Sequence, residues 1–318
     1  MIKKEDIFQF PNTKWALPFF ASHPEFCFKY VDLLKNEIGS YDFIHCVYGS
    51  PACKMNGGHA GRNINEEKYL NELDEWNKRG ISVWVTFSNY LATLKDLIHD
   101  EQSINILERL EQNNQIYGVK NGVILASDTL VKFIRHQYSS LILIASVVWF
   151  ARENKPYSKE LYEEKCNDFD IVCISYHHND KIDNIITDFS DKSDRIEILI
   201  NNICNLKCKM ITKCYEWQSR KSLGLETGKG DDIVGPACPS TIYKNQNKLT
   251  PKEESTVLTY NQTKLLSEKG FILKLASRVY NINAFKAMIY GWMINIDYRD
   301  IIENVLYGLE DKELYPDE

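Results

Sequence analysis

Four cysteines in one stretch of the chain have the residue type and the clustering that a metal centre requires. Cys204, Cys208, Cys214 and Cys238 are separated by three, five and twenty-three intervening residues. Four thiolates can hold either a [4Fe–4S] cluster or a tetrahedral zinc ion. Structural zinc sites prefer paired C-x-x-C knuckles, which this sequence does not contain. The uneven spacing therefore favours an iron–sulfur cluster, with zinc as the alternative.

Unligated thiols are the competing interpretation, because free cysteine often behaves as a small buried hydrophobe. This explains Cys46 and Cys173, which lie inside apolar runs, but it explains the polar stretch "NLKCKMITKCYEWQSRK" less well. The start of the chain, "MIKKEDIFQF", has no apolar core of the kind that an export signal needs. We therefore expect a cytoplasmic protein whose nine cysteines are free thiols or metal ligands rather than disulfides.

Three further side chains are candidates for acid–base catalysis. His177 and His178 directly follow the apolar run 170–176, and Asp128 follows the run 121–127. Histidine changes its charge near neutral pH, which suits proton transfer. If a strand continued through both histidines they would point in opposite directions, so the two cannot easily face one metal. The competing interpretation is that these residues cap the helices that follow.

Anion-binding side chains are predicted in two places. The stretch "YGSPACKMNGGHAGR" contains Lys54, Asn56 and Arg62, and Arg278 follows the apolar run 271–277. The glycines of "YGSPACKMNGGHAGR" let the backbone approach a ligand closely. An arginine guanidinium can bind a carboxylate or phosphate with two hydrogen bonds. A solvated surface turn and a loop salt bridge are the alternatives. These four residues form the predicted substrate-binding set.

The elements that must position these residues alternate regularly along the chain. Apolar, strand-like runs occur at 15–20, 41–48, 81–87, 121–127, 141–150, 170–176, 195–201 and 271–277. Amphipathic, helix-like segments lie between them. Runs this apolar are typical of parallel strands covered on both faces. The pattern predicts an α/β protein with a (β/α)8 TIM-like barrel, and an open doubly wound sheet is the alternative.

Two connections are too long to be simple loops. Residues 48–65 follow the second predicted strand, and residues 202–268, with the four cysteines, follow the seventh. Both would emerge at the carboxyl ends of barrel strands, where barrel active sites lie. We therefore expect one barrel domain over 1–318 with a cysteine-containing insertion at 202–268.

Composition limits the classes of partner. A formal charge of −6 and a sequence pI of about 5.7 give no general electrostatic reason to bind nucleic acid. Only a local patch such as "KCYEWQSRK" could contact it, and a solvated loop is the simpler interpretation. No apolar run approaches the ~20 residues of a membrane-spanning helix, so we expect no membrane partner.

The stretch "ILINNICNLKCKMITKCYE" at the seventh predicted strand resembles the collagenase-like peptidase U-thirty-two superfamily. In that family a late strand is followed by an asparagine and then by spaced cysteines, which Asn202, Cys204, Cys208, Cys214 and Cys238 match in order. The chain departs from the family where Cys208 is followed by Lys-Met-Ile instead of Pro-x-Arg. It also has a cysteine at position 214, where relatives often have histidine.

The resemblance implies an iron–sulfur centre and an enzyme activity. Better understood members support oxygen-independent hydroxylation of RNA bases or quinone precursors, with prephenate as the apparent oxygen source in some. An anionic small molecule in the barrel mouth is implied, which Lys54, Arg62 and Arg278 could bind.

Three hypotheses follow. The first is an iron–sulfur barrel enzyme that modifies a small molecule or a nucleobase. The second is a zinc-stabilised hydrolase or lyase that uses Asp128 with His177 or His178, the metal serving to order the insertion. The third is a non-catalytic subunit of a heterocomplex, whose protein partner binds the polar segment 215–260.

Overall fold

The computed structural model describes residues 3–57, 64–206, 208–226, 255–276 and 281–306. In this part of the chain, eight parallel strands close into a barrel in sequence order, and β8 pairs with β1. The strands are β1 (Trp15–Leu17), β2 (Ile44–Gly49), β3 (Val83–Phe87), β4 (Gly122–Leu125), β5 (Ile142–Ala145), β6 (Ile171–Ile174), β7 (Ile196–Leu199) and β8 (Ile272–Lys274). The predicted (β/α)8 barrel is confirmed, and the open sheet is excluded.

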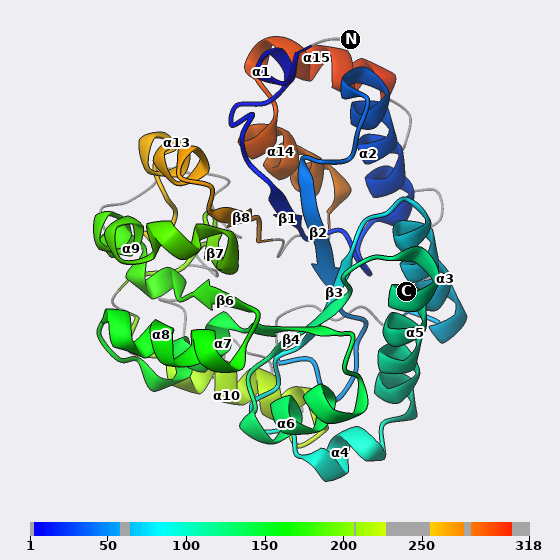
Figure 1. The fold of residues 1–318 in the computed structure, drawn as a ribbon, viewed down its shortest axis with the longest axis vertical. Coiled ribbons are helices and arrows are strands. Elements are labelled where there is room, and N and C mark those ends of the chain that lie inside the picture. The colour runs from blue at the N-terminus through cyan, green and yellow to red at the C-terminus, as the bar shows by residue number, and fades with distance from the viewer. Residues whose placement is uncertain (1–2, 58–63, 207, 227–254, 277–280, 307–318) are drawn as a thin grey trace.

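Helices surround the strands in Figure 1. The helices of the first half are α1 (Lys4–Ile7), α2 (Pro24–Ile38), α3 (Glu66–Lys78), α4 (Leu94–Ile98), α5 (Glu101–Tyr117), α6 (Asp128–Gln137) and α7 (Val147–Glu153). Those of the second half are α8 (Lys159–Asp168), α9 (Ile182–Phe189), α10 (Ile211–Ser222), α13 (Tyr260–Glu268), α14 (Ile282–Met293) and α15 (Ile296–Val305). Two 3-10 turns, η1 (Tyr176–Lys181) and η2 (Ser190–Arg195), flank α9.

Side chains from alternate strand positions fill two separate cores. Ala16, Cys46, Trp84, Ile124, Ile144, Ile171 and Ile272 pack together inside the barrel. The larger core lies between the strands and the helices. Because both strand faces are covered, the strands read as continuous apolar runs in the sequence.

The prediction for residues 141–150 is wrong in its second half. The strand ends at Ala145, and Val147 begins helix α7. Ser146 separates the two, because its side chain accepts a hydrogen bond from the backbone N–H of Val148 and caps the helix. A continuous apolar run cannot distinguish a buried strand from a buried helix.

The chain closes on itself beside the barrel. Phe8 forms an antiparallel bridge with Ile294, and the backbone N–H of Asn295 donates to the carbonyl of Ile7 at 2.8 Å. Helices α1 and α15 therefore lie together in Figure 1. None of the helices in the described ranges is long and apolar enough to cross a membrane.

Candidate functional site at the carboxyl ends of the strands

Helix α10 lies across the carboxyl ends of several strands. Near its start, Thr212 Oγ1 donates to the carbonyl of Arg152 on α7 at 2.9 Å. In its middle, the Tyr215 hydroxyl hydrogen bonds to that of Tyr176 after β6 at 2.8 Å. Near its end, the Ser219 carbonyl accepts from Asn89 Nδ2 after β3 at 3.1 Å. The extra helix of the long connection after β7 thus covers part of the barrel mouth.

A second group of hydrogen bonds fixes the backbone around Cys204. The N–H of Cys204 donates to Thr256 Oγ1 at 3.2 Å, and the N–H of Thr256 donates to the Cys204 carbonyl at 3.1 Å. Asn179 Nδ2 then holds the same segment, because it donates to the carbonyls of Leu199 at 3.0 Å and Thr256 at 2.6 Å. Residues from both ends of the long connection therefore meet at the carboxyl end of β7.

Cys204 and Cys208 share one turn. The N–H of Cys208 donates to the carbonyl of Asn205 at 3.1 Å, which closes the chain back on itself. The side chains of Cys204 and Cys208 are in hydrogen-bond contact, and this contact lowers the pKa of Cys208 to about 6. Burial opposes the shift, while the backbone amides of Met210 and Ile211 at the start of α10 support it. The turn therefore favours a thiolate at Cys208.

His177 lies beside these thiols. Its Nε2 is 3.9 Å from Cys204 Sγ, and its Nδ1 is 3.1 Å from the carbonyl of Leu206. A carbonyl can only accept, so Nδ1 carries a proton, and Nε2 is the ring nitrogen that faces the sulfur. The ring is supported by Tyr176, whose centroid is 4.6 Å away.

His178 points into the protein instead. Its Nε2 is 2.9 Å from the carbonyl of Lys155, and its Nδ1 is 2.6 Å from the Tyr162 hydroxyl. The carbonyl accepts from Nε2–H, so Nδ1 accepts from the hydroxyl. Burial lowers the pKa of His178, and its hydrogen bond to the Lys155 carbonyl only partly offsets this. Both ring nitrogens of His178 therefore contact neighbouring segments of the protein, Nδ1 on α8 and Nε2 at Lys155. The predicted catalytic role of His178 stays a prediction.

The divergence of the two histidines was expected from an extended strand, but its cause is different. Tyr176–Lys181 forms a 3-10 turn, not a continuation of β6. Ser175 caps this turn by accepting a hydrogen bond from the N–H of His177. The turn directs His177 to the cysteines and His178 to α8.

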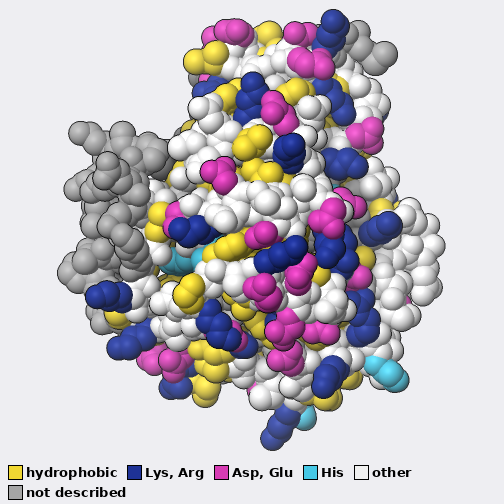
Figure 2. Space-filling view, turned by 60° about the vertical axis from the view of Figure 1, so that its left-hand side comes forward, with side chains coloured by type: hydrophobic (Ala, Val, Ile, Leu, Met, Phe, Trp, Pro, Cys, Tyr) yellow, Lys and Arg dark blue, Asp and Glu magenta, His cyan; other side chains and the backbone are white. Residues whose placement is uncertain are grey.

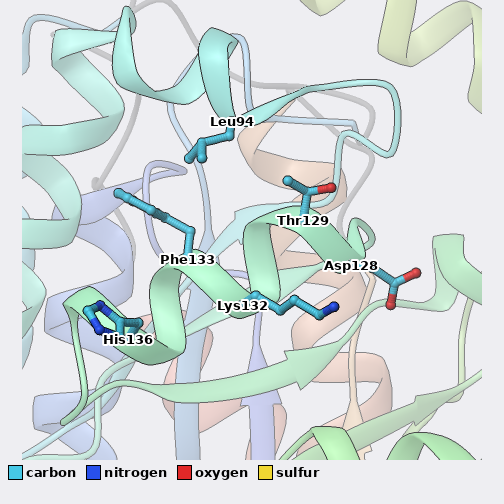
Figure 3. Close-up of a pocket in the computed structure, with 6 residues that line it drawn as sticks. All are labelled: Leu94, Asp128, Thr129, Lys132, Phe133 and His136. Carbon is cyan, nitrogen blue, oxygen red and sulfur yellow. The ribbon is translucent and has the colours of Figure 1, made fainter.

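Asp128 lies away from the cysteines and histidines. It is the first residue of α6 and its side chain is 70% exposed, with Lys165 Nζ 3.9 Å away. Figure 3 shows it at one end of a cavity of about 600 Å³ between α4 and α6, in which Leu94 and Phe133 face each other. The contacts of the described residues give Asp128 no part in the site around Cys204.

The loop after β2 docks on the end of β3 through its backbone. Asn89 Nδ2 donates to the carbonyl of Lys54 at 2.7 Å, and the N–H of Asn89 donates to the carbonyl of Met55 at 2.9 Å. The Lys54 side chain is exposed, whereas Asn56 is buried. The predicted substrate-binding role of both residues stays a prediction.

Three predicted site residues lie outside the described ranges. These are the anion-binding candidates Arg62 and Arg278 and the distal cysteine ligand Cys238. Cys214 is described and half-buried, at the fourth position of α10. Among the residues that the structure describes, no three histidine, cysteine or acidic side chains form a group that can hold a metal ion. The fold thus places two of the four predicted ligands together and leaves the rest of the set undetermined.

Gly57 sets how closely the loop approaches the barrel. A Cβ atom there would lie 2.3 Å from the Ser88 carbonyl oxygen and 2.6 Å from the backbone N of Asn89. We expect Gly57→Ala to lower the free energy of unfolding by about 2 kcal/mol, because overpacking against backbone forces the loop to move. Urea titration measures this loss.

Gly291→Ala is the matched control, because a Cβ there meets nothing within 4 Å and the residue lies inside helix α14. Its stability should be unchanged or slightly increased, since alanine favours a helix. Equal stability of the Gly57→Ala protein and wild type would show that the loop is not held against β3.

Sequence reasoning missed an ion pair inside the barrel. Lys274 Nζ is 2.8 Å from Glu197 Oε2, with the two side chains 8% and 0% exposed. Lys274 also lies over the Tyr48 ring, 3.9 Å from its centroid. Burial alone would lower the pKa of Lys274, but the Glu197 carboxylate raises it, so the lysine stays charged. The sequence did contain a signal for this ion pair, because the apolar runs 195–201 and 271–277 each include a charged residue, Glu197 and Lys274.

Charges of both signs are interspersed over the face drawn in Figure 2, with lysine and arginine next to aspartate and glutamate. This mixture agrees with the modest net charge of −6. The expectation that nucleic acid is not a general partner stays a prediction.

Comparisons with known proteins find little similarity in sequence. No family model matches the chain, and no curated protein matches it. Among solved structures, the chain is similar to one described as the U32 peptidase Mk0906, with 13% sequence identity and a TM-score of 0.47. The match covers 74% of this chain and 85% of that chain.

Proposed function

We propose that the chain is a barrel enzyme with a thiolate-held iron–sulfur centre at the mouth. The observation that supports this best is the contact between the Cys204 and Cys208 side chains at the carboxyl end of β7. Cys214 and Cys238 would complete the set of four ligands. Active sites of (β/α)8 barrels lie at this face, because the loops after the strands meet there.

The chain's own residues prepare these two positions for a metal. Metal binding requires deprotonated cysteine, and the hydrogen bonds at Cys208 favour its thiolate. Thr256 holds the backbone on the other side of the turn, at Cys204. A bound cluster would supply electron transfer at potentials that depend on burial and on hydrogen bonds to sulfur.

The proposed substrate is an anionic small molecule or nucleobase, and the proposed reaction class is oxygen-independent hydroxylation. Asn202 supports a polar ligand at this face, because its side chain is 1% exposed and both its amide atoms lack a hydrogen-bond partner among the described residues. A buried amide without partners is uncommon and calls for a ligand or water. Lys54, Arg62 and Arg278 are the proposed anion-binding residues, and the segment 215–260 is the proposed surface for a protein partner.

Zinc is the second candidate, and His177 is the observation in its favour. Metal-bound histidines almost always donate their other ring N–H to a carbonyl or carboxylate. His177 has this arrangement, with Nδ1 at Leu206 and Nε2 facing Cys204. Zinc binds mixed sulfur and nitrogen sets, and a protein with zinc alone would move the proposed chemistry toward hydrolysis or lyase action.

Metal content separates these proposals. We expect protein purified without oxygen to contain iron and acid-labile sulfide and to absorb broadly in the visible range. Cys208→Ser should retain less than about a tenth of the iron, because the cluster is held by cysteine thiolates. Elemental analysis and sulfide determination measure both.

Cys53→Ser is the matched control, since Cys53 is half-buried like Cys208 but lies in the loop after β2, where Ser50 is its hydrogen-bonding neighbour. Its iron content should equal that of wild type. A well-folded wild-type protein without any bound metal would overturn both candidates.

A further inference from the structure

The pair Cys204 and Cys208 has a property that does not depend on a bound metal. The two side chains are in contact, and the Asn205–Cys208 turn holds them on one short segment of backbone. Both cysteines are half-buried, so a small molecule can reach them, whereas Cys27, Cys46 and Cys173 are buried. Contact between two accessible thiols is the arrangement from which a disulfide forms.

We propose that the metal-free protein carries a redox-active dithiol at Cys204 and Cys208, which closes to a disulfide by exchange with a low-molecular-weight disulfide such as oxidised glutathione. The inference concerns the same turn as the proposed function but needs no metal.

The exchange takes two steps. The sulfur of Cys208 attacks one sulfur of glutathione disulfide, so that a mixed disulfide forms and one glutathione thiolate leaves. The sulfur of Cys204 then attacks the Cys208 sulfur and releases the second glutathione. The two thiol protons end on the two glutathione molecules. The protein loses two electrons, and the glutathione disulfide gains them.

The assignment of attacking and resolving thiols follows from their surroundings. Cys208 is separated by Lys209 and Met210 from the first residue of α10, a helix of twelve residues, and the amides of Met210 and Ile211 hydrogen bond to its sulfur. Cys204 lies behind it, with its backbone held by Thr256 and its sulfur beside His177. Cys208 is therefore placed to react first and Cys204 to resolve.

The disulfide and a metal at this turn exclude each other, because both need the same two sulfur atoms. Oxidation would therefore block metal loading, and a bound metal would protect the pair from oxidation. This gives the site two states that depend on thiol–disulfide balance and on metal supply.

Thiol mapping tests the proposal. The full chain, stripped of metal with a chelator and reduced, is incubated with excess oxidised glutathione, alkylated and digested. We expect peptide mass spectrometry to show a Cys204–Cys208 disulfide as the main product. In Cys204→Ser the resolving thiol is absent, so a stable glutathione adduct should accumulate on Cys208. Cys53→Ser is the matched control, because Cys53 is half-buried but lies in the loop after β2, and this variant should form the disulfide as wild type does.

Two results would overturn the inference. One is that Cys204 and Cys208 both remain alkylatable in wild type, and the other is that Cys208 pairs with Cys214. Mapping of wild type alone decides the matter if a variant fails to fold. A protein that forms the disulfide but never binds metal would contradict the proposed function and leave this inference intact. A protein that binds iron but forms no disulfide after the metal is removed would contradict this inference and leave the proposed function intact.

Discussion

Glu197→Leu should lower the free energy of unfolding by about 3–5 kcal/mol, because it leaves the buried Lys274 ammonium without its counter-ion. The partners are 2.8 Å apart, and the glutamate side chain is fully buried. The remaining contact of the lysine with the Tyr48 ring does not replace a carboxylate. Urea titration with circular dichroism measures the loss.

Two controls separate burial from charge. The double variant Lys274→Met with Glu197→Leu should recover most of the stability, since a buried ion pair can often be replaced by apolar side chains of similar volume. Glu25→Gln breaks a pair of the same residue types, 2.9 Å apart and with both side chains more than half exposed. Glu25→Gln should lower the free energy of unfolding by less than about 1 kcal/mol. A Glu197→Leu protein as stable as the Glu25→Gln protein would show that the barrel interior is hydrated.

The stability of wild type should fall by up to about 3 kcal/mol between pH 6.5 and pH 4, through the protonation of His45. Burial lowers the pKa of His45 from 6.5 to about 4, and the attraction of Glu197 opposes this only in part. In this window the unfolded chain binds the proton and the folded chain does not. The stabilisation is therefore complete above pH 6.5 and is lost as the pH falls to about 4.

His45→Phe isolates this contribution from that of the carboxylates. Phenylalanine can keep the edge-to-face contact with Trp84, whose ring centroid is 5.0 Å from that of His45. Its free energy of unfolding should change less with pH than that of wild type over the same window. Parallel curves for the two proteins would contradict a depressed pKa at His45.

The barrel itself was predictable because its strands are covered on both faces. Each of the eight apolar runs overlaps one strand, and the strands pair in sequence order. Their lengths were less predictable. The run 141–150 contains a strand and the start of a helix, since Ser146 ends one element and caps the next without interrupting the apolar pattern strongly.

The location of the candidate site could be predicted from the sequence, but only some of its residues could. The long connection after β7 indicated the carboxyl end of that strand, and Cys204 and Cys208 lie there in contact. His177 was a candidate through its position after β6, but its distance of 3.9 Å from Cys204 depends on the η1 turn. His178 was an equal candidate in the sequence, and only the tertiary structure shows that its ring contacts Tyr162 and Lys155 instead of the cysteines.

Local patterning determined the class of fold, the order of the strands and the end of the barrel at which the cysteines lie, because these depend on the period of apolar residues and on the lengths of connections. The tertiary structure decided which side chains meet. Glu197 and Lys274 are 77 residues apart and form a pair only because β7 and β8 are neighbours in a closed barrel. Thr256 likewise contacts Cys204 across 52 residues. Contacts of this kind depend on the register and twist of the sheet, which no single segment of the chain contains.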